Sequence, residues 1–132
     1  MRVIDKVAWI QLNDSRVLMT RSRGKTVWYI PGGKREADET DQQTLAREIR
    51  EELAVDVDTT RAQSAGVFEA QAHGHAEGVL VRMTCYTAPY HSELKPSAEI
   101  EELDWFTYAD RPRTAPVDWL IFDDLRAKGL LA

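Results

Sequence analysis

The sequence has little of what disulfide-stapled, collagen-like or membrane-spanning proteins contain. Its 132 residues include one cysteine, 7 glycines and 5 prolines. The lone thiol, Cys85, has no partner for an intrachain disulfide, and its apolar neighbours favour a buried thiol in a reducing compartment. No apolar run approaches the roughly 18 residues of a membrane-spanning helix, and Asp5 and Lys6 interrupt the N-terminal segment. We therefore expect a cytoplasmic protein with no membrane partner.

Basic residues are outnumbered and dispersed. The chain has 17 lysines and arginines against 22 aspartates and glutamates, a formal net charge of −5. Proteins that bind extended DNA or RNA present a basic stripe, so we expect no extended nucleic-acid partner. A small phosphorylated ligand is compatible with this charge, because a bound cation reverses the electric field at an acidic site.

What the chain does contain is enough apolar material for one hydrophobic core. Hydrophobic residues make up 43% of the sequence and charged residues 30%. These fractions and the length are ordinary for one globular domain, and no internal repeat or linker divides the chain. We therefore expect a single domain over residues 1–132.

β-Branched and aromatic residues are grouped in short runs that predict strands. Such runs cover residues 2–12, 16–19, 27–30, 65–70, 79–88 and 100–106. Asn13 and Asp14 predict a hairpin turn between the first two runs. Gly32 and Gly33 follow Pro31 and predict a tight loop at the end of the third run.

Two segments are expected to be helical. The first has Thr40 as its N-cap, with Gln43 completing a capping box, and it continues to Leu53 without glycine or proline. The second lies near the C-terminus, where helical spacing relates Leu120, Ile121, Leu125 and Leu130. Together with the strands, these segments predict an α/β fold in which at least two helices cover a mixed sheet.

The first predicted helix carries an acidic face beside its apolar face. At about 100° per residue, Glu48, Glu51 and Glu52 share one side. Carboxylates at i,i+4 repel by a few tenths of a kcal/mol, and a hard cation such as Mg²⁺ offsets this repulsion because it prefers oxygen ligands. The arrangement is typical of metal-assisted phosphoryl chemistry. For an isolated Glu-x-x-Glu-Glu pattern, a solvated acidic surface is the alternative.

The residues around the acidic face follow a longer pattern. From Gly33 the sequence reads five residues, Glu39, seven residues, Arg47-Glu48-Ile49, one residue, Glu51-Glu52, one residue, Ala54-Val55. This pattern resembles the Nudix box, in which glycine stands where this chain has Ala54. Eight of the nine specified positions match within 23 residues, which is far more specific than a short motif. Looser similarity at residues 28–34 and 99–106 extends the resemblance, to the MutT-like branch of the family, over most of the chain.

The resemblance implies an α/β/α sandwich that hydrolyses a nucleoside diphosphate linked to another moiety, with Mg²⁺ or Mn²⁺ as cofactor. For the MutT-like branch we expect a nucleoside triphosphate, ordinary or modified, that is cleaved to the monophosphate and pyrophosphate. The implied metal ligands are Glu48, Glu51, Glu52, Glu99 and the carbonyl of Gly32. The implied catalytic residues are Glu51, Glu52, Glu99 and Arg47, with Gly33 and Glu39 in structural roles. Glu101 and Glu102 compete with Glu99 for the late acidic position.

Other interpretations stay open at this point. A Nudix-fold module that senses a nucleotide without hydrolysing it is the alternative function, and degenerate carboxylates would favour it; here all of them are present. An acidic domain that mediates protein contacts is a third interpretation. The chain is expected to be a monomer or a homodimer.

Several weaker signals lie outside the Nudix box. Arg21, Arg23 and Lys25, in the loop before the glycine pair, are candidates for contact with substrate phosphates, against the alternative of a solvated loop. His73 and His75 have no third metal ligand nearby, so we interpret them as part of an exposed loop. Aromatic residues such as Tyr29 are assigned to the core.

Overall fold

The structure, a computed structural model, describes residues 2–132. The strands are β1 (Val3–Trp9), β2 (Leu12–Asn13), β3 (Arg16–Ser22), β4 (Gly32–Lys34), β5 (Asp56–Val57), β6 (Gln63–Gln71), β7 (Leu80–Thr87), β8 (Tyr90–His91) and β9 (Ile100–Phe106). The helices are α1 (Asp41–Leu53) and α2 (Pro116–Ala127), and short 3-10 helices cover Thr59–Arg61 and Tyr108–Arg113.

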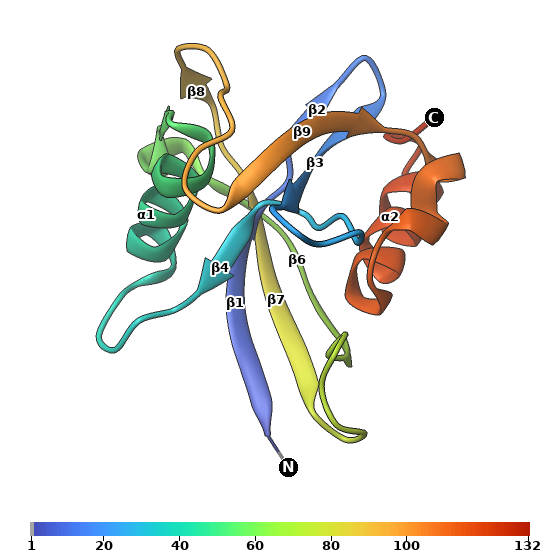
Figure 1. The fold of residues 1–132 in the computed structure, drawn as a ribbon. Coiled ribbons are helices and arrows are strands. Elements are labelled where there is room, and N and C mark those ends of the chain that lie inside the picture. The colour runs from blue at the N-terminus through green and yellow to red at the C-terminus, as the bar shows by residue number, and fades with distance from the viewer. Residues whose placement is uncertain (1) are drawn as a thin grey trace.

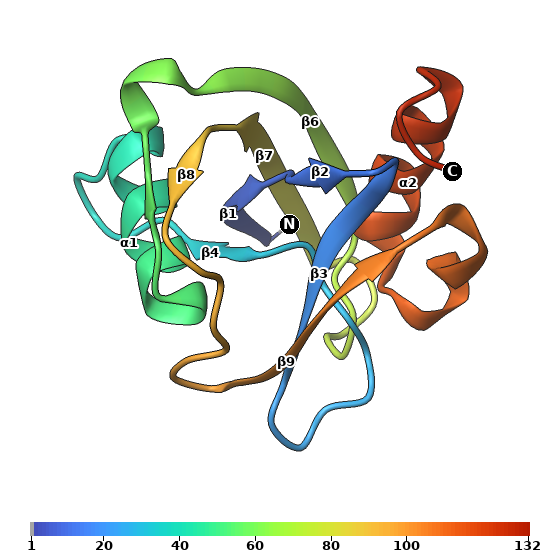
Figure 2. The same ribbon diagram turned by 90° about the horizontal axis from the view of Figure 1, so that it is seen from above.

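The strands of the described residues are arranged in three sheets between the two α-helices. A four-stranded mixed sheet has the order β4-β1-β7-β6, a three-stranded sheet has the order β2-β3-β9, and β5 pairs with β8. Strand β1 is antiparallel to β4 and parallel to β7. Helices α1 and α2 lie on opposite sides of the sheets (Figure 1), and the view from above shows the same layering (Figure 2). The predicted α/β/α sandwich with mixed strands is confirmed.

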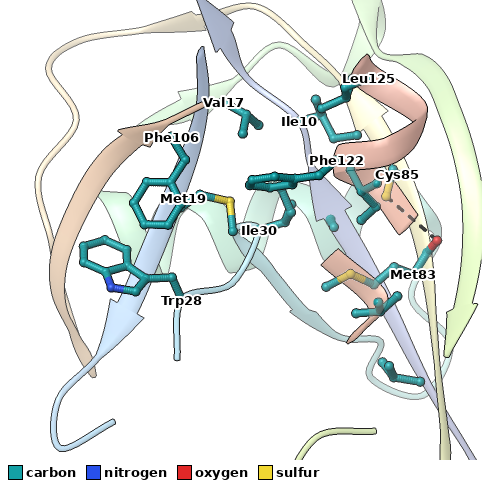
Figure 3. Close-up of a cluster of buried hydrophobic side chains, with 14 of the residues drawn as sticks. Ile10, Val17, Met19, Trp28, Ile30, Met83, Cys85, Phe106, Phe122 and Leu125 are labelled. Atoms are coloured by element: carbon teal, nitrogen blue, oxygen red, sulfur yellow. Dashed lines mark hydrogen bonds between the residues drawn. The ribbon is translucent and has the colours of Figure 1, made fainter. Parts of the chain in front are cut away.

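Strand β1 is an interior strand of the four-stranded sheet, and its two faces pack toward different helices. Val7 and Trp9 belong to a buried cluster that includes the apolar face of α1. Ile4 and Ala8 belong to a second buried cluster, which includes the apolar residues of α2 (Figure 3). Because successive side chains of a strand point to opposite faces, Lys6 lies on the same face as Ile4 and Ala8, away from α1.

Cys85 lies inside the second cluster (Figure 3). Its S–H group donates to the carbonyl oxygen of Met83 at 3.9 Å. Burial raises the pKa of the Cys85 thiol to about 12. The thiol is therefore protonated and unreactive at neutral pH, as the sequence predicts for a buried cysteine.

Helix α1 follows its sequence prediction closely. Thr40 Oγ1 accepts from the amide of Gln43 at 3.1 Å, and Gln43 Oε1 accepts from the amide of Thr40 at 2.9 Å, so the capping box is confirmed. The predicted strands at residues 65–70, 79–88 and 100–106 correspond to β6, β7 and β9. The predicted hairpin turn joins β2 and β3.

Two predicted segments differ from the structure. The expected strand over residues 27–30 is reduced to isolated bridges at Trp28 and Tyr29. The strand begins instead at Gly32, where the sequence predicts a tight loop, because residues 32–34 pair with β1. Tertiary pairing therefore overrides the local preference of a glycine pair for a turn. The first expected strand also divides into β1 and β2, which belong to different sheets.

Ala54 ends α1 in the left-handed conformation, with φ 58° and ψ 30°. This conformation strains a residue that has a Cβ atom, whereas glycine adopts it freely. We expect Ala54→Gly to raise the free energy of unfolding by about 0.5–1 kcal/mol after allowance for the more flexible unfolded chain, without changing activity. Thermal denaturation measures this.

Ala46→Gly is the matched control, because Ala46 lies inside α1 with helical backbone. Glycine there is expected to destabilise the protein by about 0.5–1 kcal/mol. Equal destabilisation by the two variants would show that Ala54 is not strained.

Candidate active site

The acidic face of α1 divides between the cleft and the solvent. Glu48 and Glu52 are one helical turn apart and both line a cleft of about 770 Å³. Glu52 is 6% exposed and the Glu48 side chain 14% exposed. The Glu51 side chain is 53% exposed and does not line the cleft. The structure therefore brings two of the three predicted helix carboxylates together at the cleft.

The glycines of β4 let these carboxylates approach the strand. A Cβ atom on Gly33 would lie 2.2 Å from Cδ of Glu48, so the Glu48 carboxylate occupies the space that any other side chain would fill. Gly32 has a φ of 150°, and a Cβ atom there would lie 2.2 Å from the carbonyl oxygen of Val7. The amide of Gly32 donates to Oε1 of Glu52 at 3.3 Å.

Arg47 connects the loop after β4 with the helix. Its Nε and Nη2 atoms each donate to the Glu39 carboxylate at 2.8 Å, a bidentate pair. Its Nη1 atom donates to Glu48 Oε1 at 2.7 Å, and Nη2 also donates to the carbonyl oxygen of Lys34 at 3.0 Å. The hydrogen bonds from Arg47 to the Glu39 carboxylate lower the pKa of Glu39 to about 2. Its contact with Glu51, four residues further along the helix, is longer, 3.6 Å between Nη1 and Oε2.

Glu52 is a buried carboxyl group in negatively charged surroundings. Burial raises its pKa well above the ordinary value, and the charges of Glu48 and Glu99 act in the same direction. The Gly32 amide and the Lys6 ammonium act in the opposite direction. An ionised Glu52 therefore needs a further positive charge nearby, which a divalent cation provides.

Glu99 is the late glutamate that reaches the cleft. It lines the cleft together with Glu52, from the segment just before β9, whereas Glu101 and Glu102 do not line it. Those two glutamates form ion pairs with Arg21, at 3.5 and 3.3 Å from its Nη2 atom. Within residues 2–132, the side chain of Glu99 makes no hydrogen bond or ion pair.

The basic residues that line the cleft are lysines. Arg21 donates to the carbonyl oxygen of Lys25 at 2.8 Å and faces the glutamates of β9, and Arg23 contacts the carbonyl oxygen of Ala98 at 3.5 Å. Neither predicted arginine lines the cleft, whereas Lys6, Lys25 and Lys34 do.

Asp118 and Lys6 are titratable groups to which the sequence analysis assigns no functional role. Asp118 is fully buried near the start of α2, and its two oxygens accept from the amides of Ile30 and Ala115, both at 3.2 Å. Burial raises the pKa of Asp118 to about 7. Burial also lowers the pKa of Lys6, against the charges of Asp118 and Glu52. The signal for Lys6 was present in the sequence, since it is a charge among the core positions of β1 at alternate spacing.

Three further residues line the cleft although the sequence pattern favours other locations for them. Tyr29, assigned to the core, is half-buried and lines the cleft. His73 and His75, assigned to an exposed loop, are exposed, and they also lie along the cleft. No local signal could have placed this loop, because its position depends on how β6 and β7 pair within the sheet.

The donor set fits a hard divalent cation. Glu48 and Glu52 supply carboxylate oxygens beside the glycine strand, and the space next to Gly33 is kept free for one of them. Within residues 2–132, no three or more histidine, cysteine, aspartate or glutamate side chains form a ready-made cluster around one ion. Glu48 is instead held by Arg47, and Glu51 does not line the cleft.

An acidic helix packed on a glycine strand, within a mixed α/β sandwich, defines the class of the Nudix fold. The chain matches the NUDIX domain over residues 4–125. This chain therefore belongs to the Nudix family and is a Nudix hydrolase, acting on phosphoanhydrides.

Individual relatives agree with this assignment. The chain is 28% identical to the CTP pyrophosphohydrolase of Escherichia coli (strain K12) over 110 residues, which are 80% of this chain and 76% of that protein. It is 32% identical to the NAD-capped RNA hydrolase NudC of Vibrio atlanticus (strain LGP32) over 109 residues, but covers only 38% of that protein. The alignment with the solution structure of the E. coli ORF135 protein covers 96% of this chain and 91% of that protein, with a TM-score of 0.74 and 26% identity.

The described helices are short or amphipathic. None within residues 2–132 combines the length and apolarity that a membrane crossing requires.

Gly33→Ala tests the close approach of β4 and Glu48. The new methyl group would overlap the Glu48 carboxylate, which is the flexible end of its side chain and can move aside. We expect activity to fall by about 10- to 100-fold, because catalytic geometry is lost, while the melting temperature changes little. Gly129→Ala is the control: it adds strain at a φ of 73° in open space. It should lower stability and leave activity intact, and the reverse pattern would contradict the assignment.

Asp118 should make stability depend on pH. A carboxyl group whose pKa rises from 3.8 to about 7 on folding binds more protons in the folded state between these values. Its contribution is therefore complete below pH 4 and is lost as the pH rises to 7. Relative to Asp118→Asn, which does not titrate, wild type should lose roughly 2–4 kcal/mol over this interval. Urea denaturation at pH 4, 5.5 and 7 measures the difference, and a constant difference would refute the prediction.

Proposed function

We propose that this chain hydrolyses a nucleoside triphosphate, ordinary or modified, to the monophosphate and pyrophosphate, with Mg²⁺ or Mn²⁺ as cofactor. The observation that carries the proposal is the pairing of Glu48 and Glu52 with the glycine strand at a cleft of about 770 Å³. Pockets for small ligands have volumes of roughly 300–1,000 Å³, so the cleft is large enough for a nucleotide.

The names of the relatives support the same substrate class. One relative is the E. coli CTP pyrophosphohydrolase. Another is a MutT-like protein of Streptomyces ambofaciens, 29% identical over 94 residues, which are 71% of this chain and 56% of that protein. The nucleotide that this chain prefers depends on residues along the cleft rather than on the fold.

The carboxylates and Arg47 have distinct roles in this proposal. Glu48, Glu52, Glu99 and the carbonyl of Gly32 hold the divalent cation, and Glu51 joins them from the edge of the same helix face. When bound, the cation neutralises phosphate charge and lowers the pKa of water. Arg47 positions Glu48 through its 2.7 Å hydrogen bond and orders the preceding loop through Glu39.

The reaction forms one bond and breaks another. The oxygen of water bonds to the α-phosphorus, and the phosphoanhydride bond between the α- and β-phosphates breaks with pyrophosphate as the leaving group. Glu99 accepts the proton from water, because its carboxylate has no partner in the described part of the chain and it lines the same cleft as Glu52. Lys34 and Lys25 line the same cleft and neutralise the phosphate oxygens.

The test is product release from a panel of nucleotides with Mg²⁺ or Mn²⁺. The panel contains nucleoside triphosphates, oxidised nucleotides, nucleotide sugars, ADP-ribose and dinucleoside polyphosphates. We expect wild type to release pyrophosphate from triphosphates, and Glu52→Gln to lose roughly 10²- to 10⁴-fold in kcat, because a neutral amide oxygen binds a divalent cation more weakly than a carboxylate does.

Glu93→Gln is the matched control, because Glu93 is exposed and lies outside the cleft. It should retain wild-type rates. Nucleotide binding without turnover of any compound on the panel would overturn the proposal and favour a sensing module.

A further inference from the structure

Lys6 is placed among core positions but points into the cleft. It lies on β1 between Asp5 and Val7, on the face that carries Ile4 and Ala8. Ile4 and Ala8 are buried, whereas the Lys6 side chain is half-buried and lines the cleft. An ammonium group at this place costs solvation free energy that an apolar residue would not cost. The position therefore carries a charge for a reason other than packing.

Within residues 2–132, the Lys6 ammonium has no hydrogen-bond or ion-pair partner. The ammonium group lies over the aromatic ring of Tyr29, with 5.9 Å between Nζ and the ring centroid. The carboxyl groups on either side bond to backbone instead. Asp118 accepts from the amides of Ile30 and Ala115, and Glu52 accepts from the amide of Gly32.

A second lysine adds to the positive charge at this place. Lys6 and Lys34 are directly opposite each other on β1 and β4, and both line the cleft. Like charges opposite each other on neighbouring strands destabilise a sheet. Binding of a ligand with oxygen acceptors relieves this repulsion, because an ammonium group has three donors and no acceptor.

We propose that Lys6 binds substrate and determines specificity, donating from the cleft floor to an acceptor oxygen of the nucleotide, either a phosphate oxygen or a carbonyl of the base. The proposal rests on the proposed function, since it assumes a nucleotide in the cleft. Lys6 lines the same cleft as Glu48 and Glu52 of α1 and Val117 of α2, so a nucleotide that occupies the cleft comes within reach of its ammonium group.

The chemistry of the ammonium group sets the direction of discrimination. A substrate that places an amino group over Lys6 would bring two donors together, and the partly desolvated ammonium would lose its partner. A substrate that places oxygen there would gain a charge-assisted hydrogen bond. If the contact is to the base at C4 of a pyrimidine or C6 of a purine, where UTP and ITP carry oxygen and CTP and ATP carry an amino group, Lys6 favours UTP over CTP and ITP over ATP.

The test compares Lys6→Met with wild type. Methionine keeps the length of the side chain at a position whose neighbours are apolar, and thermal denaturation checks its folding. Lys6→Gln, which keeps a polar side chain, is measured in parallel. The control is Lys128→Met, which removes the same charge from a surface pair with Asp124, outside the cleft. KM and kcat are measured for UTP, CTP, ITP, ATP and ribose 5-triphosphate, and binding of the same compounds is measured by calorimetry in EDTA.

We expect Lys6→Met to raise KM, and the dissociation constant in EDTA, by about tenfold or more, with a smaller change in kcat. A loss that includes ribose 5-triphosphate places the contact at a phosphate. A loss confined to UTP and ITP places it at a base carbonyl. Values for Lys6→Met and Lys6→Gln that equal those of wild type and Lys128→Met would overturn the proposal.

The binding measurement separates this proposal from the proposed function. Wild-type turnover combined with unchanged Lys6 variants overturns the role of Lys6 alone. A wild type that neither binds nor hydrolyses these nucleotides overturns the proposed function, and the role of Lys6 with it.

Discussion

The hydrogen bonds of one guanidinium group, that of Arg47, order the acidic end of the cleft. Three carboxylates on one helix face repel one another, and the Glu48 carboxylate lies against strand β4 in the space that a Cβ atom on Gly33 would fill. Arg47 offsets this repulsion by bonding to Glu48 while it holds Glu39 in a bidentate pair and the carbonyl oxygen of Lys34. Loop, strand and helix are thus tied by charge-assisted bonds, which are roughly twice as strong as neutral ones.

The site contains buried ionisable groups that lower the stability of the folded state, and the apolar packing of the rest of the fold offsets this cost. Glu52 and Asp118 are buried carboxyl groups, and Lys6 is a half-buried ammonium between them. Such groups oppose folding when they are charged and unpaired. They persist because the two apolar clusters on either face of β1 hold the sheet and both helices together. Glu52 and Lys6 line one cleft, and perturbed titratable groups in a cleft are characteristic of functional sites.

Local sequence signals predicted the elements that local chemistry controls. The capping box of Thr40 and Gln43, the apolar stripe of α1 and the strand at residues 100–106 needed only neighbours a few positions apart. The strained end of α1 at Ala54 was predictable for the same reason, because the helix signal and the following turn adjoin in the chain. The strand β4 was missed, since glycines favour turns until a distant strand, β1, pairs with them.

The family, the acidic helix face and the buried cysteine could be inferred from the amino-acid sequence, because each depends on residue types at short spacing. Which of the acidic and basic residues reach the cleft depends on the folded arrangement of the sheets and helices. That arrangement turned Glu51 toward solvent, selected Glu99 over Glu101 and Glu102 by pairing the latter two with Arg21, and brought Lys6 from the other end of the chain. Sheet register and strand alternation fix these choices, because they place residues that are distant in sequence on one face, and no short pattern encodes that pairing.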